Sequence, residues 1–350
     1  MRSVSIDGRF VGNPYPVFII AELSANHLKS VEIAEKTLRA MKDSGADAVK
    51  LQTYTPDTMT IDSDEEYFQI KQGTIWDGRT LYQLYQEAYT PWEWQPKLKK
   101  LAEELGLICF SSPFDQSAVD FLESMDVPAY KVASFEITDI PLIEYIASKQ
   151  KPIIISTGIA TLTDIEEALQ ACKWAGNDQI ALLKCTSAYP APFEDANLRT
   201  IPDMASRFGT IVGLSDHTMG ISVPLAAVAL GARIIEKHFI LDRNLGGPDA
   251  AFSLQPDEFK TMVTNIREVE KALGEVRYDL NEKARRSREF ARSLFVAEDT
   301  AQGEILTEKN VRSIRPGYGL HPRHLKDVVG KKVKKTIIRG TPLAWEHIET

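Results

Sequence analysis

The chain has 350 residues, 43% of them hydrophobic and 26% charged, and a formal net charge of −8. This is the composition of an ordinary globular protein, and no apolar run reaches the roughly 20 residues that a membrane span needs. The first apolar segment is too short for a signal peptide, and an acidic chain is not expected to bind nucleic acid. Its three cysteines, Cys109, Cys172 and Cys185, form no CxxC pair, so we expect buried thiols in a reducing cytoplasm.

From residue 17 onward, short apolar segments alternate with amphipathic ones. Segments rich in Ile, Val and Leu predict eight strands, at residues 17–22, 47–52, 107–112, 129–134, 152–157, 180–185, 210–215 and 233–239. Helical patterns follow at residues 30–45, 93–106, 116–125, 139–148, 161–176, 223–231 and 256–274. Eight β–α units favour a (β/α)8 TIM barrel over residues 1–275. The alternative is a doubly wound sheet, which usually has fewer strands and a glycine-rich loop after the first.

Three further segments complete the predicted organisation. Residues 53–92 form an elaborated loop after the second strand, on the face where barrels carry out chemistry. Residues 276–293 predict a charged linker, and residues 294–350 a small β-rich domain. The balance of Lys and Arg against Asp and Glu is 25 to 39 in residues 1–275 and 16 to 10 in residues 276–350. The basic end could therefore bring positive charge to an anionic small molecule or dock on an acidic surface.

Polar residues at the carboxyl ends of barrel strands are catalytic candidates. Here the strand ends carry Glu22, Lys50, Gln52, Ser111, Ser112, Lys131, Ser134, Glu136, Ser156, Thr157, Lys184, Thr186, Ser187, Ser215, Asp216, His217, Glu236 and His238. Several lysines that point into a closed barrel predict an anion to neutralise, because a buried lysine is costly without a partner. Lys50, Lys131, Ser134, Ser156 and Ser215 would form a cage for a phosphate or carboxylate.

His217 and His238 end consecutive strands, which lie about 4.8 Å apart. With oxygen donors nearby and no cysteine pair, the two imidazoles favour a divalent metal with open positions, Mn²⁺ first and Mg²⁺ or Co²⁺ as alternatives. Two loops would cover the mouth. Residues 185–195 carry Tyr189, which could stack on a sugar, and residues 246–253 carry Asp249, expected to be exposed on a Gly-Pro turn.

The motifs "IAELSANH", "GADAVKLQTY", "YKVASFEITD", "IISTGIAT", "GLSDHTMG", "IEKHF", "GGPDAAFS" and "RPGYGL" together resemble the sialic acid synthase family. That family condenses phosphoenolpyruvate with an amino-sugar aldehyde to make nonulosonic acids. The resemblance covers essentially the whole chain, and implies that residues 294–350 form an antifreeze-like (SAF) domain. It also implies a homodimer in which this domain caps the partner's barrel.

The resemblance assigns roles to individual residues. It implies a metal on His217 and His238 and a phosphoenolpyruvate site formed by Lys50, Lys131, Ser134, Ser156, Ser187 and Ser215. Glu22, Gln52, Glu136, Tyr189 and Asp249 would face the sugar and the reacting carbons, and Arg315 would reach the sugar from the other subunit. Of these, Glu22, Glu136, Lys50 and Lys131 are the predicted catalytic residues. For Asn26 and His27, two roles remain open, holding the loop or touching the substrate, and positioning is the expected one.

Departures from the sialic acid branch narrow the resemblance. The chain reads "SANHLKS" where that branch usually reads "GxNHxG", and it has "LLKCTSAYPAP" where that branch has an asparagine near Ser187. These features resemble the pseudaminic acid synthases, which implies 2,4-diacetamido-2,4,6-trideoxy-L-altrose as the acceptor. N-acetylneuraminate and legionaminic acid synthases are the alternatives. An apolar surface for the C6 methyl would come from Met59, Phe114, Phe252 or residues 53–92.

Two other classes of protein remain as hypotheses. A Schiff-base aldolase would use a strand-end lysine, Lys131 or Lys184. A non-catalytic carbohydrate or ice binder is suggested only by the SAF-like end, which lacks the regularly spaced threonine array that this function would need.

Overall fold

The computed structural model describes residues 3–71 and 73–349, and the chain forms two compact units, Met1–Gly274 and Glu275–Thr350. The outermost ends of the predicted domains, residues 1 and 350, lie outside the described residues. Among the described residues, no helix is long and apolar enough to cross a membrane.

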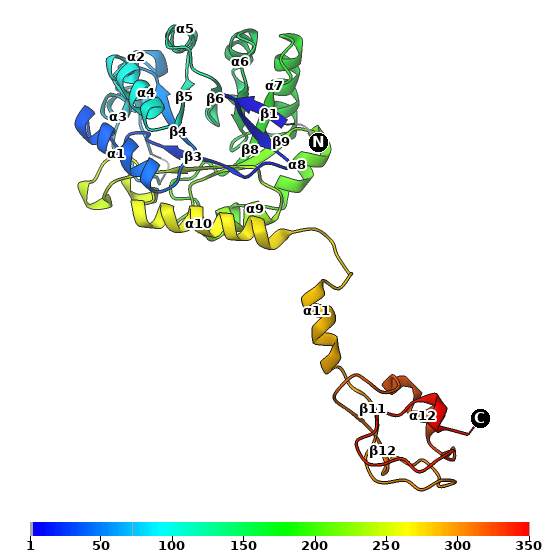
Figure 1. The fold of residues 1–350 in the computed structure, drawn as a ribbon. Coiled ribbons are helices and arrows are strands. Elements are labelled where there is room, and N and C mark those ends of the chain that lie inside the picture. Colours follow the sequence, from blue (N-terminus) through cyan, green and yellow to red (C-terminus); the bar gives the residue numbers. More distant parts are fainter. Residues whose placement is uncertain (1–2, 72, 350) are drawn as a thin grey trace. The chain divides into compact units, whose positions relative to one another are not determined.

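The larger unit is a closed barrel of eight parallel strands in the order β10-β3-β4-β5-β6-β7-β8-β9 (Figure 1). The strands are β3 (Phe18–Glu22), β4 (Ala48–Thr53), β5 (Ile108–Pro113), β6 (Tyr130–Val132), β7 (Ile153–Ser156), β8 (Ile180–Cys185), β9 (Ile211–Asp216) and β10 (Ile234–His238). Each lies within one residue of a predicted segment or inside it. The closed parallel barrel confirms the predicted TIM barrel. Its strands read as apolar runs in the sequence because they are buried on both faces.

The register brings charged residues to one end of the barrel. Closure pairs β10 with β3, so that His238 lies opposite Glu22, and Glu22 lies opposite Lys50 of β4. On the other side of β10, Glu236 pairs with Ser215 of β9. Residues distant in sequence therefore meet around the end of the barrel where the strands terminate.

Helices surround the strands (Figure 1). They are α1 (Val31–Asp43), α4 (Gln95–Glu104), α5 (Gln116–Ser124), α6 (Ile140–Ser148), α7 (Leu162–Trp174), α8 (Thr200–Phe208), α9 (Ser222–Ala229) and α10 (Pro256–Leu273). Their apolar faces pack on the strands; α1, for example, buries Ala34, Leu38 and Met41. Helix α8 was not among the predicted helices, and its segment contains a proline near its start.

The opposite end of the barrel is closed by a hairpin that the sequence reading missed. Strands β1 (Ser3–Ile6) and β2 (Arg9–Gly12) pair antiparallel. Ile6 and Val11 pack in one cluster with Phe18 and Phe110, which come from the interior of the barrel. The hairpin thus seals the amino-terminal end and leaves the carboxyl end for the cavity.

The predicted elaborated loop, residues 53–92, contains short helices. These are α2 (Pro56–Met59), η1 (Glu66–Phe68) and α3 (Leu81–Ala88), followed by η2 (Trp92–Trp94). Thr55 and Thr80 each begin a helix with a capping box. The segment is anchored to the barrel, since the Trp92 indole donates to the carbonyl of Tyr54 at 3.1 Å.

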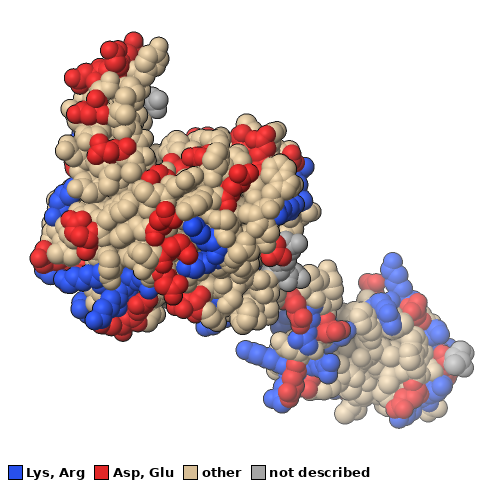
Figure 2. All heavy atoms as spheres, turned by 90° about the horizontal axis from the view of Figure 1, so that it is seen from above, with Lys and Arg blue, Asp and Glu red and all other residues tan. Residues whose placement is uncertain are grey.

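The smaller unit begins with α11 (Glu282–Ser287) and η7 (Arg288–Phe290). Strands β11 (Ser293–Val296) and β12 (Val311–Ile314) then pair antiparallel, and α12 (Leu325–Val328) follows. Leu294, Leu306 and Val333 belong to a small apolar core of its own. In Figure 2, lysine and arginine side chains are frequent on the visible face of this unit.

Candidate active site

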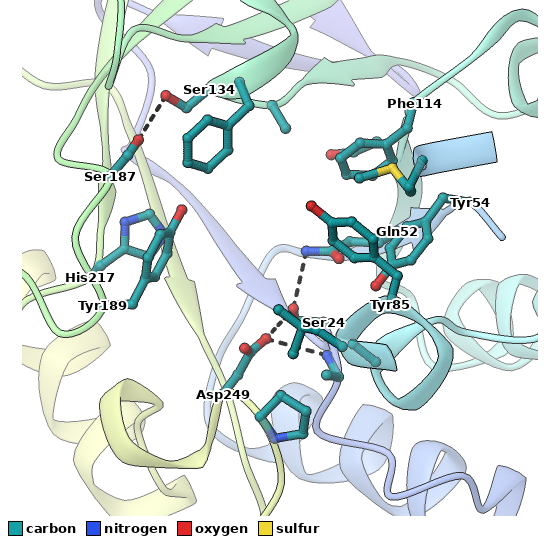
Figure 3. A pocket seen from close by; sticks show the side chains of 18 of the residues that line it. Ser24, Gln52, Tyr54, Tyr85, Phe114, Ser134, Ser187, Tyr189, His217 and Asp249 are labelled. Atoms are coloured by element: carbon teal, nitrogen blue, oxygen red, sulfur yellow. Dashed lines mark hydrogen bonds between the residues drawn. The ribbon is translucent and has the colours of Figure 1, made fainter. Parts of the chain in front are cut away.

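A cavity of about 520 Å³ opens at the carboxyl ends of the barrel strands. It brings together the predicted site residues of the barrel: Glu22, Lys50, Gln52, Lys131, Ser134, Glu136, Ser156, Ser187, Tyr189, Ser215, His217, His238 and Asp249. Figure 3 shows part of this set, with Ser134, Ser187 and His217 on one side and aromatic residues on the other. The cavity has the size and the few convergent polar groups of a small-molecule site.

Two buried lysines form the charged floor. Lys50 Nζ lies 2.8 Å from Glu236 Oε1 and 3.0 Å from Glu22 Oε2. Lys131 Nζ donates to Ser156 Oγ at 2.7 Å and lies 3.9 Å from Glu236 Oε1. Burial opposes the charge on Lys50, but the two carboxylates outweigh it and raise its pKa. For Lys131, burial dominates and lowers the pKa, because Glu236 only partly compensates it.

Glu236 was predicted only as one of the polar strand-end candidates and was given no individual role. One carboxylate oxygen, Oε1, faces both lysines and accepts a hydrogen bond from Ser215 Oγ at 2.8 Å. The other, Oε2, is buried without a hydrogen-bond partner among the described residues. Burial opposes its ionisation, yet Lys131 and Lys50 lower the pKa of Glu236. Its spacing of two residues from His238 on the same strand was the available signal, since such residues share a face.

Serine hydroxyls line the wall beside Lys131. Ser187 Oγ donates to Ser134 Oγ at 2.8 Å, and Ser134 Oγ accepts from the backbone N–H of Ile159 at 3.1 Å. Gly158 allows this approach: a Cβ at that position would lie 2.2 Å from Ser187 Oγ and 2.5 Å from Ser134 Oγ. Gly158 is thus a further site residue. Its role follows only from the close packing of the two serine side chains against it.

The two predicted metal ligands lie side by side, with ring centroids 5.2 Å apart. His217 Nδ1 lies 3.1 Å from the carbonyl of Thr186, so this nitrogen donates, and in the neutral imidazole Nε2 then carries the lone pair. His238 Nδ1 is buried without a hydrogen bond among the described residues, and its Nε2 lies 3.2 Å from Glu22 Oε2. The two imidazoles are nitrogen donors of the kind that divalent cations bind.

In the described part of the chain, no three His, Cys, Asp or Glu side chains together have the geometry to hold a metal ion. A cation on the two histidines would therefore take its other ligands from water or substrate.

A separate ion pair, between Lys237 and Asp216, supports the loop that carries His217. Lys237 lies between two cavity-facing residues of β10 and is completely buried. Its ammonium group contacts the Asp216 carboxylate and the Thr218 carbonyl. Asp216 also accepts from the Thr218 backbone N–H at 3.1 Å. These contacts fix the backbone on both sides of His217 and make Lys237 and Asp216 positioning residues.

Asp249 is buried, at 8% exposure, and the expectation of an exposed turn residue is wrong. Its carboxylate accepts from the Ser24 hydroxyl and lies 3.6 Å from His238 Nδ1. Burial opposes ionisation, but the charge of His238 and the hydrogen bond from the Ser24 hydroxyl lower the pKa of Asp249. Ser24 in turn accepts from Gln52 at 3.0 Å. Because the carboxylate of Asp249 has these partners, the 246–253 segment folds into the cavity.

Glu22 and Glu136 have opposite electrostatic environments. Burial favours the neutral form of Glu22, but Lys50 and His238 outweigh it and lower its pKa to about 2. Glu136, in η3 (Phe135–Thr138), has a buried Oε2 without a hydrogen-bond partner among the described residues. Burial raises the pKa of Glu136 to about 7. One carboxyl is thus a fixed anion, and the other can exchange a proton near neutral pH.

An aromatic cluster covers the histidines. The ring of Tyr189 lies 4.5 Å from that of His217 and 5.4 Å from that of Trp76. Trp76 belongs to the 53–92 segment and donates to the carbonyl of Pro248 at 3.0 Å. Three loops therefore meet over this side of the cavity.

Several polar residues of the predicted loops and strand ends lie outside the cavity. Asn26 donates to the Phe239 carbonyl at 2.9 Å and to Ser253 Oγ at 2.8 Å, which ties the first loop to the last strand. His27 packs edge-on against Trp94. Lys184 donates to the backbone carbonyl of Cys185 and is not part of the cavity lining.

Arg315 lies in the smaller unit and is exposed. Cys109, Cys172 and Cys185 are buried free thiols, and Cys185 lines the cavity.

The fold and the cavity define a (β/α)8-barrel enzyme with its reactive groups at the carboxyl ends of the strands. The model of the NeuB family matches residues 37–278, and that of the SAF domain matches residues 291–349. The chain belongs to the NeuB family, which confirms the resemblance to sialic acid synthases.

Two relatives match this chain over almost its full length, and a solved structure matches most of it. The chain is 50% identical over 327 residues to a pseudaminic acid synthase of Campylobacter jejuni subsp. jejuni, covering 93% of this chain and 95% of that one. It is 50% identical over 335 residues to the pseudaminic acid synthase of Helicobacter pylori, covering 95% and 98%. The crystal structure of N-acetylneuraminic acid (sialic acid) synthetase from Leptospira borgpetersenii has a TM-score of 0.74 and 30% identity, covering 82% of this chain and 95% of that one.

Proposed function

We propose that the protein is a pseudaminic acid synthase, which condenses phosphoenolpyruvate with 2,4-diacetamido-2,4,6-trideoxy-L-altrose and water to give pseudaminic acid and phosphate. The observation that carries the proposal is a single cavity in which two buried lysines and a group of serines lie beside a histidine pair. The 50% identity to two pseudaminic acid synthases supports the choice of acceptor, against 30% for the N-acetylneuraminic acid synthetase.

Phosphoenolpyruvate carries a carboxylate and a phosphate, and both need positive charge and hydrogen-bond donors. Lys50 and Lys131 supply the charge, and Ser134, Ser156, Ser187 and Ser215 supply hydroxyls. Charge-assisted hydrogen bonds of this kind are about twice as strong as neutral ones. The serine wall also fixes the orientation of the substrate, because Ser134 and Ser187 already hold each other.

In the proposed reaction, C3 of phosphoenolpyruvate bonds to the aldehyde carbon of the open-chain sugar, and the aldehyde oxygen takes up a proton. C2 becomes cationic and is stabilised by the fixed negative charge of Glu22. Water adds to C2 and gives up a proton, for which Glu136 is the acceptor because its pKa is about 7. The C2–O bond then breaks, the C2 hydroxyl becomes a carbonyl, and phosphate leaves with the hydroxyl proton. Gln52, Tyr189 and Asp249 orient the sugar.

The residues that would hold a divalent cation, Mn²⁺ first, are His217 and His238. When bound, such a cation supplies Lewis-acid polarisation of an oxygen and a template for the two substrates. We expect His217→Ala and His238→Ala to lose Mn²⁺ binding in calorimetry while their circular dichroism stays native. Unchanged Mn²⁺ affinity in both variants would contradict the assignment.

The smaller unit has a separate role in the proposal. A homodimer in which this domain caps the partner's barrel would bring Arg315 to the acceptor sugar. The unequal charge supports this, since residues 276–350 hold 16 Lys and Arg against 10 Asp and Glu. A cytoplasmic location is part of the proposal, and the three buried free thiols, which suit a reducing compartment, support it.

The deciding experiment measures phosphate release by the purified protein with phosphoenolpyruvate, Mn²⁺ and one acceptor at a time. The acceptors are the altrose sugar, the corresponding diacetamido precursor of legionaminic acid, and N-acetylmannosamine. The proposal expects the largest kcat/KM for the altrose sugar; a larger value for either of the others assigns the enzyme to that branch. Borohydride with pyruvate tests the aldolase alternative, and a covalent adduct on Lys131 or Lys184 would overturn the mechanism.

A further inference from the structure

The first loop of the barrel carries a serine in a backbone conformation that favours glycine. Ser24 has a φ of 44° and is the second residue of the turn from Leu23 to Asn26, which the Asn26 N–H closes on the Leu23 carbonyl at 3.0 Å. Glycine adopts a positive φ at this turn position at the least cost, because a Cβ crowds the neighbouring carbonyl. A strained residue of this kind points to a function of its side chain. The role of the Ser24 hydroxyl therefore needs an explanation.

The hydroxyl of Ser24 is buried and both donates and accepts a hydrogen bond. It accepts from Gln52 Nε2 at 3.0 Å and donates to the carboxylate of Asp249. Gln52 Nε2 also donates to Glu22 Oε1 at 2.8 Å. In Figure 3, dashed lines run from Gln52 through Ser24 to Asp249. Ser24 thus links two buried carboxylates, those of Glu22 and Asp249.

These two carboxylates face the two nitrogens of one imidazole. Glu22 Oε2 lies 3.2 Å from His238 Nε2, and Asp249 Oδ2 lies 3.6 Å from His238 Nδ1. The contacts therefore close a ring of five side chains: His238, Glu22, Gln52, Ser24 and Asp249. The Ala25 N–H also donates to the Asp249 carboxylate, but at a long 3.5 Å. The Ser24 hydroxyl is thus the group that holds this carboxylate against His238.

We propose that Ser24 is a positioning residue, whose hydroxyl closes this ring and fixes the Asp249 carboxylate beside His238 at the cost of a strained turn. The inference rests on the proposed function, in which His238 would hold the cation and Asp249 would orient the sugar. Without the hydroxyl, the ring opens between Gln52 and Asp249. The Asp249 carboxylate and the His238 imidazole then lose a fixed position, while the barrel strands stay as they are.

Two substitutions separate the hydroxyl from the strain. Ser24→Ala removes the hydroxyl and keeps a Cβ at positive φ, whereas Ser24→Gly removes both. We expect both variants to lose about 10-fold to 100-fold in kcat/KM for phosphate release with phosphoenolpyruvate, Mn²⁺ and the altrose sugar. Calorimetry should show about 10-fold weaker Mn²⁺ binding in both. Ser24→Gly should nevertheless unfold about 2–4 °C above Ser24→Ala, since glycine relieves the turn.

Asp7 provides the matched control. It has a φ of 49° in the turn between β1 and β2, at the opposite end of the barrel. Asp7→Gly should likewise unfold at a higher temperature than Asp7→Ala. Both Asp7 variants should keep the wild-type kcat/KM and the wild-type Mn²⁺ affinity.

A double variant tests the route through Asp249. Asp249→Ala removes the partner of the Ser24 hydroxyl. Adding Ser24→Ala to this variant should therefore lower kcat/KM by less than about 2-fold, because two residues that act as one unit do not give independent losses. Losses that multiply in full would show that Ser24 does not act through Asp249 and would contradict the proposal.

Wild-type kcat/KM and Mn²⁺ affinity in Ser24→Gly would overturn the inference, and this variant also serves if Ser24→Ala does not fold. An impaired Ser24→Ala beside a Ser24→Gly of near wild-type activity would show that Ser24 only supports the turn. If no acceptor releases phosphate with the wild-type enzyme, the proposed function is wrong. The Mn²⁺ affinities of the Ser24 variants then decide the inference by themselves.

Discussion

Gly158→Ala is the substitution whose effect the structure defines most closely. The added Cβ would lie 2.2 Å from Ser187 Oγ and 2.5 Å from Ser134 Oγ. Ordinary contacts of a Cβ begin near 3.4 Å, so one or both serines must move by about 1 Å. A displacement of that size at a reacting substrate costs on the order of 10²-fold in rate. Overpacking of the buried wall costs about 1–3 kcal/mol of the free energy of unfolding.

The assay is kcat/KM for phosphoenolpyruvate at saturating sugar, with urea unfolding in parallel. We expect kcat/KM to fall about 100-fold and the KM for the sugar to change little. Combining the change with Ser187→Ala removes the nearest oxygen, so the double variant should lose less activity than the two single losses multiplied together. Wild-type kcat/KM in Gly158→Ala, or strictly multiplicative losses, would refute the reasoning.

Three further predictions concern charge. If Glu136 accepts the proton of water, kcat/KM should rise as the pH passes through about 7, because the pKa of Glu136 in the folded protein lies there and the carboxylate is the active form. Glu136→Gln should remove this rise. A decrease in kcat/KM of the wild-type enzyme over the same pH range would show that Glu136 acts as an acid instead. Lys50→Met leaves Glu22 and Glu236 buried without their shared ammonium group, so urea unfolding should show a loss of about 3–5 kcal/mol; an unchanged value would show that the ion pairs add nothing. Arg315→Ala should raise the KM for the sugar far more than that for phosphoenolpyruvate, and equal increases would contradict capping by the partner.

The barrel and its charged rim could be predicted from sequence because both follow from local patterns. Strands buried on both faces are continuous apolar runs, and the polar residues at the end of each run mark its carboxyl end. Glu22, Lys50 and His238 were found in this way, and the register then places them side by side. Such a pattern gives the position of a residue along its own strand. The closure of the barrel then determines which residues of the other strands lie beside it.

The missed features depend on packing between segments distant in sequence. Asp249 reads as a turn residue, and only its contacts with Ser24 and His238 show why it is buried. Gly158 resembles any loop glycine until the two serine hydroxyls are seen within 2.5 Å of its missing Cβ. The amino-terminal hairpin, β1 and β2, carries too few residues to show a pattern, and its role as a seal follows from the interior side chains that it meets.

The charges of the cavity predict that the lysines and the histidines act as one unit. Lys50 and Lys131 are already balanced by Glu22 and Glu236 in the structure. A ligand with both a carboxylate and a phosphate therefore makes the buried site strongly negative, and burying unbalanced charge is costly. Additional positive charge must enter with it, and the histidine pair lies next to Glu22, where a divalent cation would offset the excess. In this arrangement Glu236 would keep the two ammonium groups in position, and a bound cation would allow the anion to compete for them. Binding of the two should consequently be cooperative, with each raising the affinity for the other by the same factor.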